Sequence, residues 1–109
     1  MADFDIPEPV ASFLEAVNQH DEKVFDTWFA AVPVVDDWGT EFRGLDRINA
    51  WSAEQFVGSE PTLTVADVAD RDGAIVVTGD WRSTHANGPS SFAFTVEGDK
   101  ISSMTIREG

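Results

Sequence analysis

The chain has 109 residues, 42% of them hydrophobic, and its 20 acidic against 7 basic residues give a formal net charge of −13. This length suits one domain, which we expect to span residues 1–109, and no apolar run reaches the roughly 20 residues of a membrane span. The negative charge excludes nucleic-acid binding, which needs basic residues to displace counterions, and the absence of cysteine excludes disulfides and thiolate sites.

The first ten residues, MADFDIPEPV, contain no basic stretch followed by an apolar one. They therefore lack the pattern of a secretory signal peptide, and we expect a cytoplasmic protein with no membrane partner. Lysine occurs only at positions 23 and 100, while Ala, Val and Asp are frequent. This usage is typical of an acidic bacterial protein.

Two helices are predicted within the first thirty residues. Apolar residues recur at helical spacing in both, namely Val10, Phe13, Leu14 and Val17, and then Val24, Phe25, Trp28 and Phe29. A polar break separates the two sets, and Asp21 at its end is suited to cap the second helix. Each helix thus has one apolar stripe that must pack on another element.

A strand, a turn, a second strand and a third helix are predicted between Val32 and Trp51. The β-branched run 32–37 indicates a strand, Trp38-Gly39 a turn and 40–43 a short return strand. Gly44 then allows the chain to enter a helix that extends to about Phe56. Asp46 falls in its first turn, where a carboxylate suits the exposed N–H groups.

The rest of the chain changes from helical to alternating periodicity. Four strands are predicted at 63–69, 74–83, 91–97 and 100–107, separated by turn residues. Helices followed by antiparallel strands indicate an α+β fold in which a curved sheet wraps three helices. The outer face would hold small and hydroxyl-bearing residues, and we expect it to pair with a second copy in a homodimer. Its predicted members are Val76, Thr78, Ala93, Thr95, Ser103 and Thr105.

Five short motifs in this order resemble the SnoaL-like branch of the nuclear transport factor 2-like superfamily. They are FLEAVNxxD, WFA, VVDD, RGLDRI and KISSMTI, and they extend over nearly the whole chain. The resemblance implies a cone-shaped sheet, antiparallel or mixed, with three helices and an apolar pocket at its open end, the cystatin-like architecture, commonly dimeric through the sheet. The family includes ketosteroid isomerases, epoxide hydrolases, polyketide cyclases and members with no known activity, so the fold does not fix the function.

Residue-by-residue comparison with these enzymes leaves one candidate base. The general base of ketosteroid isomerases matches Asp37, and the neighbouring Asp36 must point the opposite way on the strand. Their oxyanion hole consists of a tyrosine and a protonated aspartate, and the matching positions here hold Phe13 and Ser90. Because both donors are missing, steroid isomerisation is excluded. Asp80 and Arg82 could form an epoxide-hydrolase set with Asp37 only if their strand were turned over. We expect them to form a salt bridge on the outer face instead.

The remaining candidates have two interpretations each. His85 can lie at the pocket mouth within reach of Asp37, as a weaker catalytic candidate, or be a solvated loop residue. Tryptophans can line a ligand cavity or belong to the core. His20 has no second ligand at metal-binding spacing, so we expect no metal site and no cofactor. The residues predicted to line the pocket are Phe13, Trp28, Trp38, Phe42, Trp51, Phe56, Trp81, Ser83, Ser90, Phe92 and Met104.

The sequence therefore predicts a protein with a small-molecule pocket. One hypothesis is an isomerase-, cyclase- or hydrolase-type enzyme that acts on a small apolar substrate with Asp37 as base. The alternative is a dimeric binding or accessory module of the same fold without turnover. Neither the substrate nor the pathway is specified by these residues.

Overall fold

The elements follow the predicted order in the computed structural model, which describes residues 5–109. The helices are α1 (Val10–Asn18), α2 (Val24–Trp28) and α3 (Leu45–Gln55), followed by a 3-10 turn, η1 (Val57–Ser59). The strands are β1 (Phe29–Asp37), β2 (Thr40–Arg43), β3 (Thr62–Arg71), β4 (Ala74–Arg82), β5 (Asn87–Glu97) and β6 (Lys100–Glu108). The predicted α+β class is confirmed.

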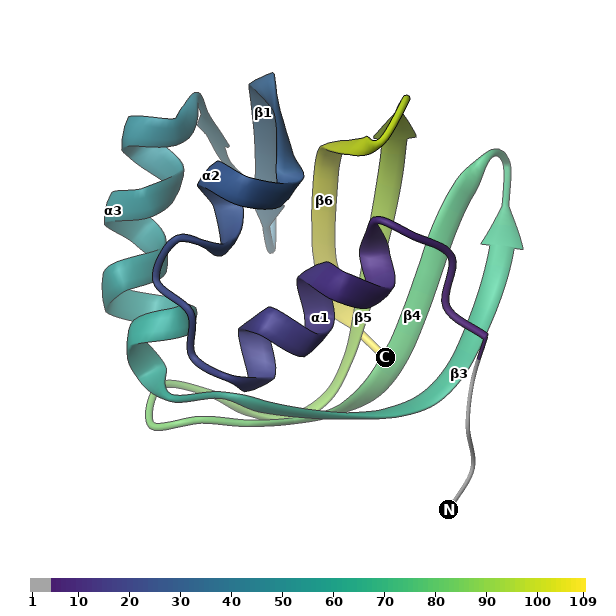
Figure 1. Cartoon of the computed structure of the whole chain (residues 1–109). Coiled ribbons are helices and arrows are strands. Elements are labelled where there is room, and N and C mark those ends of the chain that lie inside the picture. The colour runs from purple at the N-terminus through teal and green to yellow at the C-terminus, as the bar shows by residue number, and fades with distance from the viewer. Residues whose placement is uncertain (1–4) are drawn as a thin grey trace.

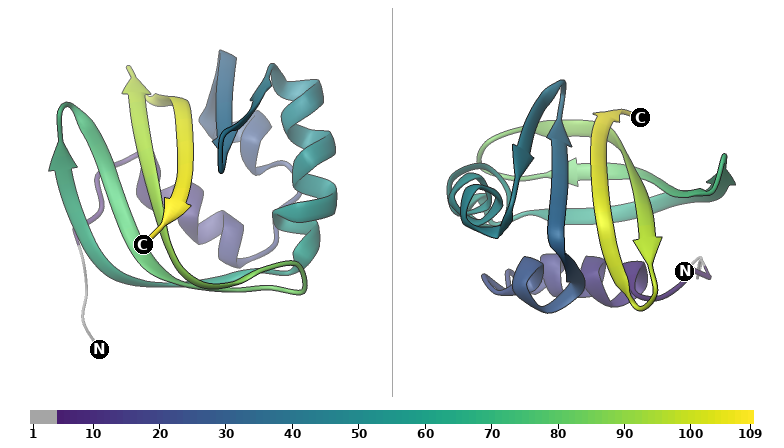
Figure 2. Two further views of the ribbon diagram at one scale, coloured as in Figure 1. Left: turned by 180° about the vertical axis from the view of Figure 1, so that it is seen from behind. Right: turned by 90° about the horizontal axis from the view of Figure 1, so that it is seen from above.

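The six strands of the described chain form one mixed sheet in the order β2-β1-β6-β5-β4-β3. Only β1 and β6 run parallel, and the other neighbours are antiparallel. The sheet curls around the helices, with α1 lying across its concave side and α3 closing the side next to β1 and β2 (Figure 1). Seen from above, β3 and β4 cross the direction of β1 and β6, which shows how strongly the sheet bends (Figure 2). The result is the predicted cone.

The bend has a local cause in β3 and β4. The pairing register shifts between Val65 and Asp67, which is the irregularity of a β-bulge and increases the local twist. Gly79 on β4 pairs with Val65, and a Cβ at this position would overlap the carbonyl oxygen of Thr64. Glycine is therefore required where the two backbones approach most closely.

The core fills the space between the helices and the concave face. Phe13 of α1 is fully buried at its centre, with ring centroids 5.2 Å from Phe29, 5.5 Å from Phe25 and 5.7 Å from Phe94. The alternation predicted for the strands is followed, because Val77, Trp81, Phe92, Phe94, Met104 and Ile106 are all buried. Apolar side chains from every layer thus meet around one aromatic centre.

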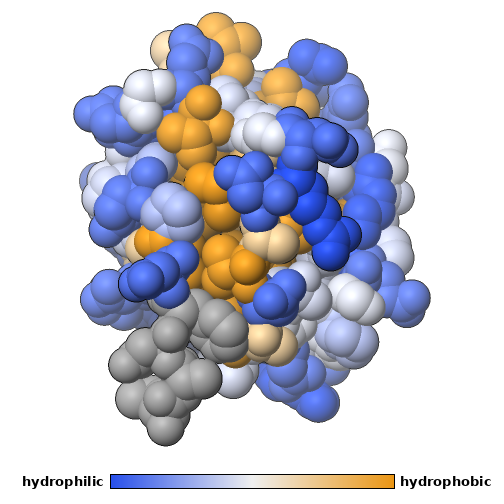
Figure 3. All heavy atoms as spheres, turned by 90° about the vertical axis from the view of Figure 1, so that its right-hand side faces the viewer, coloured by the Kyte–Doolittle hydropathy of each residue, from blue (hydrophilic) through white to orange (hydrophobic). Residues whose placement is uncertain are grey.

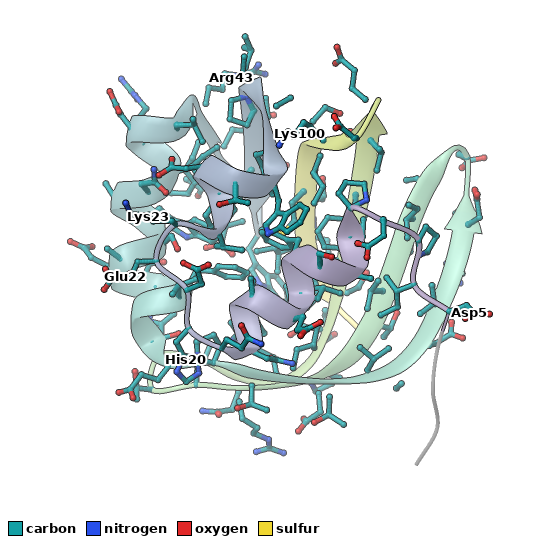
Figure 4. The ribbon with its side chains drawn as sticks, viewed as in Figure 1. Asp5, His20, Glu22, Lys23, Arg43 and Lys100 are labelled. Atoms are coloured by element: carbon teal, nitrogen blue, oxygen red, sulfur yellow. The ribbon has the colours of Figure 1, made fainter. Side chains whose placement is uncertain are left out.

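Polar side chains fasten the helical layer to the sheet at both ends. The Asn18 amide donates to the carbonyl of Leu63 at 3.1 Å and its oxygen accepts from the Leu63 N–H at 2.8 Å. His20 contacts the carbonyl of Pro61 at 2.8 Å, and Lys100 donates to the carbonyl of Thr27 at 2.7 Å. His20 and Lys100 lie at opposite ends of the helical layer in Figure 4. The helices are thereby held in one register over the sheet.

Two element boundaries differ from the prediction by more than two residues, and others, such as the ends of β3, differ by one or two. Phe29 belongs to β1 and not to the second helix, since it pairs with Ile101 of β6. The segment 87–89, predicted as a turn, is the start of β5 and pairs with 80–82 of β4. Pro89 is tolerated there because it lies beyond the last β5–β6 pair, Ser90 with Glu108.

The side of the molecule formed by the β3–β4 hairpin and the start of α1 has an apolar stripe bordered by hydrophilic residues (Figure 3). Partly buried hydrophobic residues pack against the core here, such as Val68 and Ile75 of the hairpin and Ile6 in the segment before α1. Among the described helices, none is long and apolar enough to span a membrane.

Candidate functional site

A pocket of about 280 Å³ opens at the end of the cone where β1 ends. Its walls come from the end of β1, from α3, from β4 and β5 with the loop between them, and from the end of β6. This volume lies near the lower end of the range for ligand pockets, about 300–1,000 Å³. The site therefore suits a small molecule.

Asp37, the last residue of β1, brings a carboxylate into this pocket. Its Oδ2 accepts a hydrogen bond from the Trp51 indole Nε1 at 3.0 Å. Trp51 is itself fixed, because its ring stacks on Phe42 at 5.6 Å and on Phe56 at 5.0 Å between centroids. A buried helix residue thus sets the orientation of the acid at the strand end.

The neighbouring Asp36 points to the other face of the sheet. It accepts two hydrogen bonds from the Arg107 guanidinium, at 2.9 and 3.1 Å, and one from the Gly39 N–H at 2.8 Å. The Arg107 hydrogen bond and then the Gly39 N–H hold the pKa of the Asp36 carboxyl below its ordinary value. The opposite orientation of the two acids follows from strand alternation, and the structure assigns Asp37 to the pocket side.

Replacing Asp36 with asparagine should destabilise the protein slightly at neutral pH. A carboxyl whose pKa is lowered by folding contributes stability above its unfolded-state pKa, and this contribution is lost as pH falls through the folded-state value. The difference between wild type and Asp36→Asn in urea unfolding should therefore shrink towards acidic pH and in high salt, since the pair is solvent-accessible. An unfolding difference that grows on acidification would contradict this assignment.

Aromatic rings form one continuous wall of the pocket. Phe56 stacks between Trp51 and Trp81, with centroids 5.0 Å from each, and Trp81 lies 5.5 Å from Phe92. Trp38, in the turn after Asp37, lines the opening and is 60% exposed. Its φ of 53° is left-handed, as is that of Gly39 at 96°, because the two residues form the tight turn between the paired strands β1 and β2.

Polar groups line the rim of the pocket. They are Gln55 of α3, His85 in the β4–β5 loop, Asn87 and Ser90 of β5, and Glu108 of β6. Ser83 shapes this loop, because its hydroxyl donates to the Ala86 carbonyl at 2.8 Å and its N–H donates to the Asn87 side-chain oxygen at 3.0 Å. The pocket therefore combines hydrogen-bond donors and acceptors with an aromatic wall.

The structure brings eight of the sequence-predicted site residues together at the pocket and places the other five elsewhere. Asp37, Trp38, Trp51, Phe56, Trp81, His85, Ser90 and Phe92 line it. Phe13 and Met104 are fully buried in the core, Trp28 packs at the core margin and Ser83 holds the loop. Phe42 lies beyond Trp51, in a shallow hollow with Arg47 and Glu54. Alternation identifies the inner face of a strand but not the depth of a residue along the cone.

Sequence reasoning missed three polar residues of the rim. Glu108 continues the inward alternation of Met104 and Ile106, and Gln55 lies one helical turn after Trp51, so both could have been inferred from spacing. Asn87 was assigned to a turn because Gly88-Pro89, which follow it, are typical turn residues. The aligned strand pairing, not the local sequence, brings it to the site.

The other catalytic arrangement considered does not form. Arg82 donates to Asp80 at 2.8 Å on the exposed face of β4, while Trp81 between them is buried. Within residues 5–109, no group of three or more metal-ligating side chains gathers at one place.

Neither a family model nor a curated protein matches this sequence. Solved structures do resemble it. A proposed polyketide cyclase from Sinorhizobium meliloti has 18% identity and a TM-score of 0.81, covering 94% of this chain and 96% of that chain. An epoxide hydrolase/cyclase-like enzyme with a role in pyran-ring formation in the polyether salinomycin has 18% identity and a TM-score of 0.80, with 92% and 87% covered.

A third neighbour is a hypothetical protein from Catenulispora acidiphila with a ketosteroid isomerase-like fold, in complex with trimethylamine. It has 17% identity and a TM-score of 0.74, covering 94% of this chain and 86% of that chain. Further matches are described as NTF2-like and SnoaL-like proteins. The chain therefore has the nuclear transport factor 2-like fold of the SnoaL-like proteins, as the motifs in its sequence indicated.

Proposed function

We propose that this protein binds a small, mostly apolar molecule in the pocket and that Asp37 accepts a proton from it. The observation that carries the proposal is the Asp37 carboxylate, held by the Trp51 indole in a pocket that four aromatic rings besides Trp51 help to line. The reaction would be of the isomerase, cyclase or hydrolase type, in which a base removes a proton from carbon, from a hydroxyl or from water.

The geometry supports Asp37 as the base. Among the described residues, Asp37 accepts one side-chain hydrogen bond, at Oδ2, so Oδ1 is left to accept from a ligand. The stacked Trp51 ring limits movement of the carboxylate, and such positioning is a large part of general base catalysis. Negative charge that develops on a substrate oxygen could be stabilised by the side chains of Asn87, Ser90 or His85, which line the same pocket.

The structural neighbours agree with this class of function. Two of those described above are a proposed polyketide cyclase and an epoxide hydrolase/cyclase-like enzyme with a role in pyran-ring formation. The neighbour in complex with trimethylamine supports a small ligand. These similarities extend to the fold, and the chemistry is carried here by this chain's own residues.

Binding without turnover is the second candidate. It is favoured by one observation: the described lining residues include no Lys or Arg, and Glu108 adds a second carboxylate. An anionic intermediate such as an enolate would be stabilised only by uncharged hydrogen-bond donors and would be repelled by the two carboxylates. A reaction through such an intermediate would therefore be slow. A ligand held for transport or sensing needs no such stabilisation.

Deuterium exchange in heavy water separates the two candidates without knowledge of the product. A panel of small ketones, lactones and epoxides, with and without an amino group, is incubated with the protein and followed by NMR, with thermal shift as a parallel measure of binding. Protein-dependent deuterium incorporation or ring opening supports the enzyme. Thermal stabilisation without any chemical change supports the binding module, and the absence of both across the panel contradicts the proposal.

We also propose a homodimer through the outer face of the sheet. This face holds half-buried small residues, including Val76, Thr78, Ala93 and Thr105, while the described helices lie on the concave side. Sedimentation in moderate salt should give twice the chain mass, and the dimer should weaken at low ionic strength because each copy carries a charge of −13. A monomer at tens of micromolar protein in moderate salt would refute this.

A further inference from the structure

We infer that the ligand of this pocket is an organic cation, a small ammonium compound with an apolar body. The inference rests on the proposed function, since it names the chemical class that the same pocket selects. It follows from three properties of the pocket: its negative charge, the free hydrogen-bond acceptor at Asp37 Oδ1 and its aromatic wall.

The pocket is negatively charged. Asp37 and Glu108 both line it, and among the described lining residues only the imidazole of His85 can carry positive charge. The guanidinium of Arg107 is paired with Asp36 on the outer face, at 2.9 and 3.1 Å, and that of Arg47 lines the neighbouring hollow and not the pocket. The chain as a whole adds a charge of −13, so the potential in the pocket attracts cations and repels anions.

Asp37 makes a neutral apolar ligand unfavourable. Water can solvate its Oδ1 in the open pocket, but a ligand that fills the pocket displaces this water. An ionised carboxylate that loses water without gaining a partner is destabilised, and the single Trp51 hydrogen bond at 3.0 Å compensates only part of the loss. An ammonium group supplies a positive charge next to the carboxylate. Where the amine is not fully substituted, it also supplies an N–H donor, whereas a hydrocarbon supplies neither.

The aromatic wall suits the rest of such a ligand. Trp38, Trp51, Trp81 and Phe92 contribute indole and phenyl surface to a pocket of about 280 Å³. Alkyl groups on an ammonium carry part of its charge and are bound well by aromatic surfaces, which attract cations and exclude water. Aromatic surface and carboxylate together favour an alkylammonium over both a free metal ion and a neutral alkane.

The test compares two compounds of nearly equal shape. Choline and 3,3-dimethylbutanol differ in one atom, a charged nitrogen in place of a carbon. Each is titrated into the full chain at low ionic strength and neutral pH, and the four tryptophan indole N–H signals are followed by NMR. We expect signals from Trp38, Trp51 and Trp81 to shift, while Trp28, which lies outside the pocket, does not. Choline should bind about tenfold more tightly or better.

Variants assign the preference to the pocket carboxylates. Asp37→Asn should remove most of the preference for choline and Glu108→Gln part of it. Asp70→Asn, an equal change of charge on exposed β3 away from the pocket, should leave it intact. Retention of the full preference in Asp37→Asn and Glu108→Gln together would overturn the assignment.

The outcomes separate this inference from the function on which it rests. If 3,3-dimethylbutanol binds at the pocket indoles as tightly as choline, or the anion 3,3-dimethylbutanoate does, the organic-cation inference is wrong while the ligand pocket stands. If none of the three shifts the indole signals at high millimolar concentration, both the inference and the pocket function are overturned.

Discussion

Replacement of Phe13 by alanine should lower the free energy of unfolding by about 3–5 kcal/mol, the range for a fully buried phenylalanine. Phe13 has no exposed surface, and its ring contacts those of Phe25, Phe29 and Phe94 at 5.2–5.7 Å. These three side chains come from α2, β1 and β5, so none of them can move into the cavity without disturbing another element. Urea unfolding followed by tryptophan fluorescence measures the loss.

The matched control is Val32→Ala in β1. Val32 is 82% exposed, and its truncation should change the unfolding free energy by less than about 0.5 kcal/mol. A loss below about 1 kcal/mol for Phe13→Ala would show that the aromatic centre repacks, and it would contradict the tightly packed core described above. The slope of the unfolding curve should stay the same if both variants remain two-state.

Replacement of Asp37 by asparagine should reduce the rate of any proton transfer at this pocket by about 100- to 10,000-fold. Asparagine keeps the shape of the side chain, and its carbonyl oxygen can still accept from the Trp51 indole. The fold and the pocket wall should therefore be preserved while the basic oxygen is lost. The measurement is the initial rate of deuterium incorporation or turnover with the best compound from the panel.

The neighbouring residue provides the control for this variant. Asp36→Asn removes the same charge at the next position, but on the outer face of the sheet, where the carboxylate pairs with Arg107. It should keep the wild-type rate despite its small loss of stability. If Asp37→Asn keeps its rate, or if both variants lose it equally, Asp37 is not the base and the binding module becomes the preferred function.

Residues that repeat with a clear period could be placed from the sequence. The stripe of α1 and the alternation of β4, β5 and β6 predict which side chains face inward, and Val77, Trp81 and Phe94 are indeed buried. The choice of Asp37 over Asp36 came from the family resemblance, since alternation alone shows only that the two point in opposite directions. Periodicity depends only on the spacing of residues within one helix or strand, so the inward-facing side chains can be predicted without knowing how the elements pack.

The composition of the pocket could be predicted only in part, because depth along a cone depends on non-local pairing. Phe13 and Trp81 both point inward, yet one lies in the core and the other at the pocket, and the difference arises from where α1 crosses the sheet. Asn87 reaches the site because β5 begins opposite Arg82. This register could not be predicted, because the residues at the start of β5 are typical of a turn. The Trp51–Asp37 hydrogen bond likewise depends on how α3 packs against the end of β1.

The place of β6 in the sheet has a consequence for the synthesis of this protein. β6 is the last strand in the chain, yet it lies between β1 and β5 and is the only described strand that joins the β1–β2 hairpin to the β3–β5 meander. Until β6 has left the ribosome, the two ladders share no backbone hydrogen bonds, and buried side chains such as Phe94 lack their partner Met104. We expect the native sheet to close only after β6 has been translated, so that the edges of β1 and β5 stay unpaired until then.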